Sequence, residues 1–538
     1  MIDCKKILRI WLMGTVGVGG LALMPAAGRA DDYTDLLEIL KAKGSLTSGE
    51  YRVLMAKHVH RVQMESAETQ GHAREQRISS RHGRQHGADG PAYLIEAKTA
   101  ADRAAASAAA AQQALQDARI QFNTDSKDVV KFATYVPGQG ITFHAGPIDF
   151  NISGFVNGFY TFNSPSGGPA ILGALSQGGS LLQGGRRFDS SSIRNGFLPA
   201  GLILKMNTTQ RGIDLAAVFG MYPGTNNAAV GTLNANSGGS SVALGTPGID
   251  FRQIYMTAGN KKYGTFKVGR DLGIFGSDAI LSDATLTSVG ITGNNAAPSN
   301  TSLGRIGVGY IYADWLPQIS YASPVWKGVQ ATVGVMTPLD EYNFAGGDVS
   351  ATSTQHSSPM AQAKVTYDFA KGPVTGRVWA GFMAQHQQNL QGSRIAATET
   401  RGAMATAEEV GGKINYAGFQ GVAYYYHGSG VGTTGLFFDG IANNGAKRNS
   451  EGYYVQVSYN PIKRLRIVGS YGVSNLYNAT GDDNPLLIRR NEAEIGALYL
   501  KITDWLTLIT EYEHSASAAH GPYHATDNAV SGGAVLNF

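Results

Sequence analysis

Apolar and polar residues alternate one by one along most of the chain after residue 145. One such segment is IDFNIS at residues 148–153, and others lie at residues 360–369 and 464–473. Strict alternation places apolar side chains on one face of an extended strand and polar side chains on the other. The pattern therefore predicts β-strands with one apolar and one wet face.

The connections between these segments alternate in length. Seven short turns and eight long segments predict fifteen connections and therefore about sixteen strands. We expect short turns near residues 207–212, 259–264, 323–328, 370–373, 417–419, 460–464 and 503–505, and long connections at 163–196, 223–248, 272–314, 337–359, 385–407, 429–449, 474–488 and 515–526. An even strand number, with short turns at one end and long loops at the other, is typical of transmembrane barrels.

We therefore predict an all-β fold, a transmembrane antiparallel β-barrel, over residues 145–538. Lipid cannot hydrogen-bond a free strand edge, so the sheet must close on itself. A soluble β-sandwich or a secreted adhesin is the alternative. It would show similar alternation, but its polar face would point outward and its core would lie between two sheets.

The residues before the barrel have a helical pattern. Residues 31–70 predict a helical hairpin, in which Thr47 and Glu50 form a capping box, and residues 71–92 read as a polar linker. Residues 93–124 are rich in alanine, with apolar positions spaced by three and four, a pattern that predicts a helix and fits the seam of a coiled coil. A solitary helix or a flexible spacer fits the same residues, because so many alanines match several registers.

Residues 1–30 predict a secretory signal peptide. A basic start is followed by an uncharged apolar core at residues 10–24 and by the small-residue site Gly28-Arg29-Ala30. A membrane anchor is the weaker alternative, because this core is too short to span a bilayer. Cys4 is the only cysteine and leaves with this segment, so we expect no disulfide or cysteine-based metal site.

The composition excludes other classes of protein. Four of the 44 basic and one of the 40 acidic residues lie in residues 1–30, so the remaining charges nearly balance and predict no nucleic-acid partner. No later stretch has eighteen consecutive apolar residues, which argues against a membrane-spanning helix. Five of the 12 histidines lie in residues 58–86 without the spacing of a compact ligand set, so we expect no metal and no cofactor.

These features together resemble the Gram-negative outer-membrane porins, most closely the trimeric sixteen-stranded type. The resemblance rests on the signal peptide, the alternating strands, the terminal Phe538, and the segments TFKVGRDLGIF at 265–275 and ISYASPVWKGVQATVGVM at 319–336. It implies a homotrimer in the outer membrane, in contact with lipid bilayer and lipopolysaccharide. It also implies that Phe538 is an assembly signal for the outer-membrane barrel assembly machinery. The leading segment DLLEILKAKGSLTSGEY is similar to the periplasmic extension that some porins carry before the barrel.

Charged residues at alternate positions are candidates for the pore lining. A cation facing lipid at mid-bilayer costs about 2–4 kcal/mol, so inward placement is expected. The candidates from the strands are Lys205, Lys267, Lys364, Arg377 and Arg466.

The family resemblance adds a constriction. It implies that residues 271–314 form a third external loop that folds into the pore, and that Arg270 lies on the pore wall. Strict alternation would place Arg270 with Phe266 and Val268 on the lipid side, so an inward Arg270 requires a bulge at Gly269 or an earlier strand end. Within the loop, Asp278, Asp283 and Arg305 are the charges expected to oppose the wall.

The leading hypothesis is an outer-membrane porin for passive diffusion of small hydrophilic solutes and ions, with a mild anion preference. A channel that prefers one solute class, such as small carboxylates, is the second hypothesis, because general diffusion porins lack the leading helical extension. A barrel enzyme and an adhesin are the alternatives from other classes. We find no compelling nucleophile–base pair or acid cluster, so we expect no enzyme.

Overall fold

The computed structural model describes residues 130–176, 188–225, 250–293 and 301–538. The expected signal peptide, helical hairpin, linker and alanine-rich helix (residues 1–30, 31–70, 71–92 and 93–124) lie outside these residues. No helix among the described residues combines the length and hydrophobicity needed to cross a bilayer.

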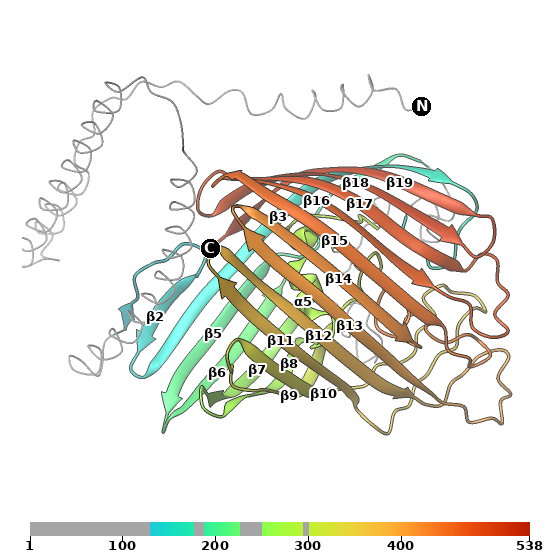
Figure 1. Ribbon diagram of the computed structural model, residues 1–538, viewed down its shortest axis with the longest axis horizontal. Helices are drawn as coiled ribbons and strands as arrows, with labels where there is room; N and C mark the ends of the chain where they lie inside the picture. Colours follow the sequence, from blue (N-terminus) through green and yellow to red (C-terminus); the bar gives the residue numbers. More distant parts are fainter. Residues whose placement is uncertain (1–129, 177–187, 226–249, 294–300) are drawn as a thin grey trace, which may run out of the picture. The chain divides into compact units, whose positions relative to one another are not determined.

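Sixteen antiparallel strands of the described chain form a closed barrel (Figure 1). The first eight are β3 (Ile148–Gly167), β5 (Gly201–Gln210), β6 (Ile213–Tyr222), β7 (Asp250–Asn260), β8 (Gly264–Leu272), β9 (Trp315–Ala322), β10 (Val329–Met336) and β11 (Met360–Lys371). The other eight are β12 (Val374–Gln387), β13 (Ala403–Tyr416), β14 (Phe419–Ser429), β15 (Asn449–Ile462), β16 (Leu465–Leu476), β17 (Ile488–Lys501), β18 (Leu506–Ala519) and β19 (His524–Asn537). Each strand pairs with its neighbours in sequence, which confirms the predicted fold class and strand number.

The barrel closes where the last strand meets the first. β19 pairs with β3 from Ala525 opposite Gly167 to Asn537 opposite Phe155. Beyond the end of β19, the N–H and C=O of Phe538 both bond to Gly154, at 2.9 and 3.0 Å. Every barrel strand therefore has two neighbours, as a sheet in lipid requires.

Tight turns join the strands at one end of the barrel. Arg211 and Gly212 form the whole connection between β5 and β6, with φ of 51° and 76°. Ala417 and Gly418 join β13 to β14 in the same way, with φ of 47° and 83°. Two consecutive positive φ values are typical of the hairpin turn that matches strand twist.

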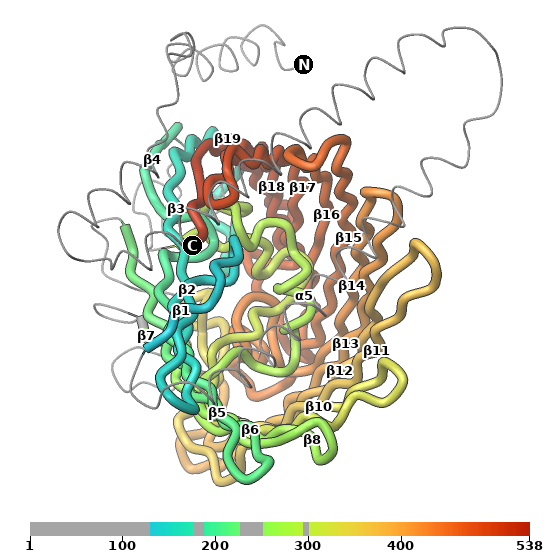
Figure 2. The backbone as a smooth tube through the Cα atoms, turned by 90° about the vertical axis from the view of Figure 1, so that its left-hand side faces the viewer, coloured from blue at the N-terminus to red at the C-terminus, as the bar shows by residue number. Residues whose placement is uncertain are grey.

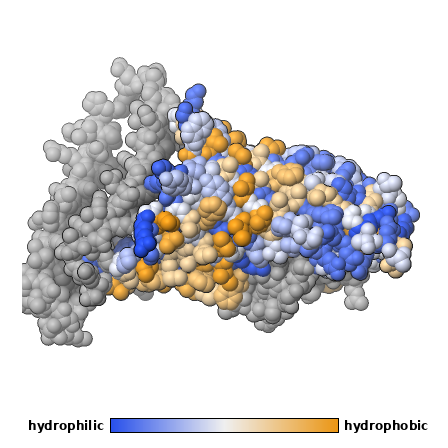
Figure 3. All heavy atoms as spheres, turned by 90° about the horizontal axis from the view of Figure 1, so that it is seen from below, coloured by the Kyte–Doolittle hydropathy of each residue, from blue (hydrophilic) through white to orange (hydrophobic). Residues whose placement is uncertain are grey.

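Side chains alternate between the two faces as the sequence predicts. On β15, Tyr453, Val455 and Val457 are exposed on the outside, whereas Tyr454 and Gln456 point inward and are buried. Apolar side chains gather on the outer surface between its two ends, and the end with the long connections is hydrophilic (Figure 3). This distribution fits a barrel surrounded by lipid and filled with polar groups.

Tyr and Trp are enriched at membrane–water interfaces, but not all aromatic residues of this barrel lie on its outer face. Trp326 and Trp505 are exposed near the short turns. Tyr425 is exposed on the outer face, but Tyr424 and Tyr426 point inward and are fully buried. Consecutive residues of one strand cannot all face the membrane.

Three short strands extend the barrel beside β3. β1 (Lys131–Phe132) and β2 (Ile141–Ala145) form a hairpin, and β2 pairs with the first residues of β3, where β19 has ended. β4 (Ser190–Arg194) pairs with Phe159 to Asn163 of β3, beyond the end of β5. β3 has 20 residues and is longer than β5 and β19. β2 and β4 therefore pair with the backbone groups of β3 that these two strands do not reach.

The connection between β8 and β9 runs inside the barrel (Figure 2). We call residues 273–314 the internal loop; its described part contains the helix α5 (Ser277–Ser282) and the 3-10 helix η3 (Ala284–Thr287). Phe275, Ile280 and Tyr310 of this loop are buried in one apolar cluster with Trp379 and Tyr454 of the barrel. The loop is therefore packed against the inner face.

Candidate functional site: the inner face of the barrel and the internal loop

Side-chain oxygens of the barrel hold the start of the internal loop. Gln362 Oε1 on β11 accepts the backbone N–H groups of Ile274 and Phe275, at 2.7 and 2.9 Å. Glu409 Oε2 on β13 accepts the N–H of Gly276 at 2.9 Å. These buried amides have no strand partner, so the side chains satisfy them.

The same arrangement continues around the inner face. Gln456 Oε1 on β15 accepts the N–H of Ala284 at 2.8 Å. Glu511 on β18 accepts the N–H of Gly290 at 2.6 Å and the hydroxyl of Ser288 at 2.5 Å. Four strands thus fix successive points of the loop, and the sequence hypotheses had not assigned this role to Gln362, Glu409, Gln456 or Glu511.

Asp278 in α5 joins the loop to two cations of the barrel. Its carboxylate lies 2.5 Å from Lys364 Nζ on β11 and 3.0 Å from Arg377 Nη1 on β12. Burial raises the pKa of Asp278, but Lys364 and Arg377 outweigh burial, so the pKa is below its usual 3.8. The acidic loop residue and the basic strand residues that the sequence nominated are therefore in direct contact.

Arg377 also pairs with Asp368 of β11. Its Nε and Nη2 donate to the two carboxylate oxygens, at 2.7 and 2.8 Å. The Arg377 side chain is 39% exposed, against 8% for Asp278. The cation rather than the loop carboxylate therefore faces the open part of the lumen.

Asp283 and Arg305 are not exposed to the lumen as a pore lining requires, although Arg305 Nη1 does reach the barrel wall, where it donates to the carbonyl of Ala493 on β17 at 3.4 Å. Both side chains are 0% exposed, with 3.9 Å between Arg305 Nε and Asp283 Oδ1. The Tyr310 hydroxyl donates to Asp283 at 2.8 Å. Burial raises the pKa of Asp283, although Arg305 and Thr285 act in the opposite direction. The loop folds back on itself here, and these charges hold its parts together.

Lys205 and Lys267, which were also predicted to line the pore, point into the barrel. Lys205 pairs across the sheet with Asn151 and Val218 and is exposed to the lumen. Lys267 bonds to Asp271, and its Nζ lies 4.9 Å from the centre of the Tyr255 ring.

Arg466 likewise lies on the inner face. Its guanidinium is 5.4 Å from the centre of the inward Tyr499 ring. A contact of this kind holds a cation against the face of an aromatic ring.

Arg270 lies on the outer face, so its predicted inward position is wrong. The pairing of β8 with β7 and β9 has no register shift, and Arg270 pairs directly with Ile254, which is 43% exposed. Arg270 Nη1 donates to the carbonyl of Trp315 at 2.5 Å. Without a bulge at Gly269, alternation keeps Arg270 on the side of Phe266.

A bulge does occur one strand earlier and turns a different arginine inward. The register of β6 with β7 shifts between Gly220 and Tyr222, and Arg252 is buried with its guanidinium 5.6 Å from the Tyr222 ring centre. Arg252 could not be predicted from the sequence, because no local signal marks this bulge. Lys413, which pairs directly with Arg377, was not among the predicted residues although alternation places it inward.

Solved structures resemble this barrel, although neither a protein-family model nor a curated protein matches the chain. The outer membrane channel DcaP of Acinetobacter baumannii aligns with a TM-score of 0.52 and 16% identity, over 73% of this chain and 97% of DcaP. The chain has the fold of a sixteen-stranded outer-membrane porin. The anion-selective porin from Comamonas acidovorans aligns with a TM-score of 0.46 and 11% identity, over 73% of this chain and 100% of that one. Salmonella typhi OmpF aligns with a TM-score of 0.44 and 10% identity, over 76% of this chain and 100% of OmpF.

The porin fold leaves Phe538 at the end of the closing strand pair. Its ring packs 6.0 Å from that of Trp505, and an added methyl group on Gly154 would lie 2.7 Å from Phe538 Cζ. In the described part of this fold, no three His, Cys, Asp or Glu side chains are grouped to hold a metal ion.

Proposed function

We propose that the chain forms a water-filled channel in the outer membrane for passive diffusion of small hydrophilic solutes and ions. The observation that carries the proposal is a closed barrel with an apolar outer face and charged side chains on its inner face. The internal loop narrows such a lumen and so sets a size limit for solutes. The fold shared with the outer membrane channel DcaP supports the same function.

A mild preference for anions is part of the proposal. Inward cations are distributed around the barrel: Lys205, Lys267, Arg377, Lys413 and Arg466, on β5, β8, β12, β13 and β16, of which β12 and β13 are neighbours. In the ring of sixteen, β5 is eight strands from β13, and β8 is eight from β16, so these pairs lie on opposite sides. Cations around a narrow lumen raise the local concentration of anions. Asp271, Asp278 and Asp368 offset part of this charge.

Reversal potentials in a salt gradient across a planar bilayer test the preference. Wild-type protein should favour chloride, and replacing Lys205 and Lys413 by Glu should shift the reversal potential toward cation preference. Lys327→Glu is the control, because Lys327 lies at a short turn beside the exposed Trp326. An ion preference unchanged by the two lumenal substitutions would overturn the proposal.

A channel that prefers small carboxylates is the second candidate. The partly exposed Arg377 guanidinium favours it, because two of its five N–H donors remain after the bonds to Asp368 and Asp278. Succinate should then interrupt the single-channel current in a concentration-dependent way. A current that succinate does not interrupt would reject the carboxylate preference and leave only the hypothesis of an unselective channel. Absence of any conductance would instead favour an enzyme or an adhesin.

We also propose a homotrimer in the bilayer, with lipopolysaccharide around it and the amino-terminal helices in the periplasm. Phe538 would serve as the signal for the barrel assembly machinery, consistent with its place at the end of β19. Three equal closing steps in single-channel recordings would support the trimer, whereas single steps would contradict it.

A further inference from the structure

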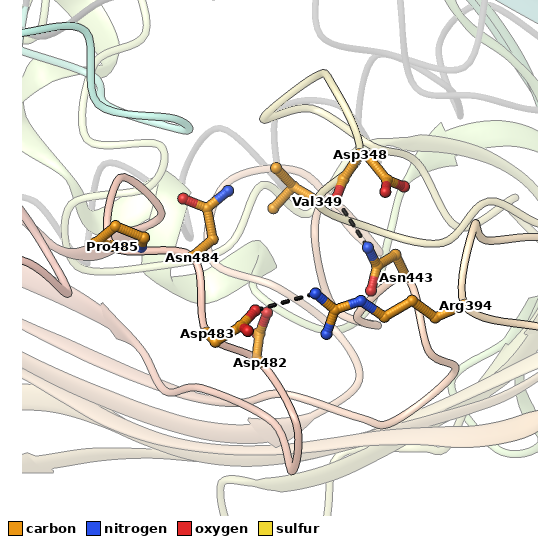
Figure 4. A pocket seen from close by; sticks show the side chains of 8 residues that line it. All are labelled: Asp348, Val349, Arg394, Asn443, Asp482, Asp483, Asn484 and Pro485. Carbon is orange, nitrogen blue, oxygen red and sulfur yellow. Dashed lines mark hydrogen bonds and ion pairs between the residues drawn. The ribbon is translucent and has the colours of Figure 1, made fainter.

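Four long connections meet around a polar pocket of about 270 Å³ at the end of the barrel opposite the short turns. Asp348 comes from the connection between β10 and β11, Arg394 from β12–β13, Asn443 from β14–β15, and Asp482 to Pro485 from β16–β17. Six of the eight lining side chains are polar, namely three carboxylates, two carboxamides and one guanidinium (Figure 4). The pocket is distinct from the internal loop and its cations.

The charges around this pocket are mostly neutralised by one another. Arg394 Nη2 lies 3.1 Å from Asp483 Oδ1. Asp482 accepts two bonds from the buried Arg448, at 2.5 and 3.2 Å. Asp348 accepts a hydrogen bond from the Ser393 hydroxyl at 2.6 Å. With Arg448 counted, three carboxylates face two guanidinium groups, so a net charge of about −1 remains and disfavours an anionic ligand.

The walls of the pocket are held in place from behind. Arg448 donates to the carbonyl of Val349 at 2.9 Å, to the Ser350 hydroxyl at 2.7 Å and to the carbonyl of Asp439 at 3.0 Å. Asn443 Nδ2 donates to the carbonyl of Asp348 at 2.8 Å. One guanidinium therefore ties three connections together, so the pocket is formed before any ligand arrives.

We propose that this pocket binds a small neutral polyhydroxylated solute of monosaccharide size. A hydroxyl group both donates and accepts, which matches carboxylate acceptors beside amide and guanidinium donors. Val349 and Pro485 provide apolar surface for the C–H face of such a solute. Pockets for small molecules commonly have about 300–1,000 Å³, so this pocket suits only a compact ligand. The proposal does not depend on conduction through the lumen.

Binding of D-glucose to the purified full chain tests the proposal. Titration followed by saturation-transfer NMR, in a detergent without a sugar head group, should show saturable binding to wild-type protein. Asp348→Ala combined with Arg394→Ala should weaken the affinity at least tenfold. Glu399→Gln is the matched control, because Glu399 lies in the same connection as Arg394 but does not line the pocket. The affinity of Glu399→Gln for D-glucose should equal that of wild type.

Three results would contradict the polyhydroxylated ligand. They are no saturable glucose binding, equal affinity in the double variant, and tight binding of glucosamine without binding of glucose. If the double variant does not fold, Asn484→Ala replaces it, with the same expected weakening. Bilayer conductance of the wild-type preparation separates the two proposals: wild-type protein that conducts but shows no saturable glucose binding rejects the pocket and leaves the channel proposal standing.

Discussion

At the scale of single residues, one carboxylate holds two cations of the barrel. Asp278 contacts Lys364 and Arg377 from a helix of the internal loop. Removing one partner of a buried ion pair leaves an uncompensated charge. The Lys364 side chain is only 14% exposed, so it is the group that depends most on Asp278.

Asp278→Asn should destabilise the folded barrel by about 2–3 kcal/mol, below the full value for a buried pair because Arg377 is partly exposed. Because the pKa of Asp278 is lowered on folding, its contribution is complete above the ordinary pKa of 3.8 and is lost as the pH falls through the folded value. The free energy of unfolding of wild type should therefore exceed that of Asp278→Asn by a constant amount from pH 7 to about pH 4, and by less below that range. Thermal unfolding of both proteins at each pH measures this difference. A difference that shrinks near pH 6 would contradict the assignment.

Sequence alternation could predict the inward strand residues but not those of the loop. Lys205, Lys364 and Arg377 follow from period two, because a paired strand has only two faces. Asp283 and Arg305 could not be placed this way, because a loop has no fixed period and their burial depends on contacts far along the chain. Arg252 faces inward only because of a bulge.

At the scale of elements, the internal loop is held by side-chain acceptors on separate strands. Glu409 accepts the Gly276 N–H and the Tyr424 hydroxyl, at 2.9 and 2.8 Å. A buried donor without a partner costs about 1–3 kcal/mol, so each acceptor contributes to the position of the loop. The inward position of Glu409 follows from alternation, but its bond to the Gly276 N–H could not be predicted from the sequence, because the two residues are far apart along the chain.

Glu409→Leu should let the start of the internal loop move and should increase the noise of the open-channel current. Glu409→Gln keeps a carbonyl oxygen for the Gly276 N–H and should stay close to wild type. The adjacent Glu408 has a side chain that is 70% exposed, so Glu408→Leu is the control. Equal noise in Glu409→Leu and Glu408→Leu would show that the acceptor does not position the loop.

At the scale of the whole molecule, closure depends on close approach between the first and last strands. A methyl group on Gly154 would lie 2.5 Å from the carbonyl oxygen of Gly201 and 2.7 Å from Phe538 Cζ. A methyl group on Gly158, in the same strand, would meet nothing within 4 Å. The sequence suggested closure through the number of strands, but this contact appears only in three dimensions.

Gly154→Val should therefore destabilise the barrel by about 1–3 kcal/mol, because the crowded position forces a backbone shift. Gly158→Val should leave stability nearly unchanged. Denaturant unfolding in detergent, followed by tryptophan fluorescence, measures both. Equal midpoints for the two variants would contradict the close packing of Gly154 against Gly201 of β5 and Phe538.

The central claim is that one face of the strands meets water and the other meets lipid. The only native cysteine is Cys4, in the expected signal peptide, so single cysteines can report on each face. Planar-bilayer currents of Lys205→Cys and Val457→Cys, before and after a charged, membrane-impermeant thiol reagent, test the claim most directly. We predict a lasting change in current only for Lys205→Cys. No current at all, or a change only for Val457→Cys, would contradict a water-filled barrel.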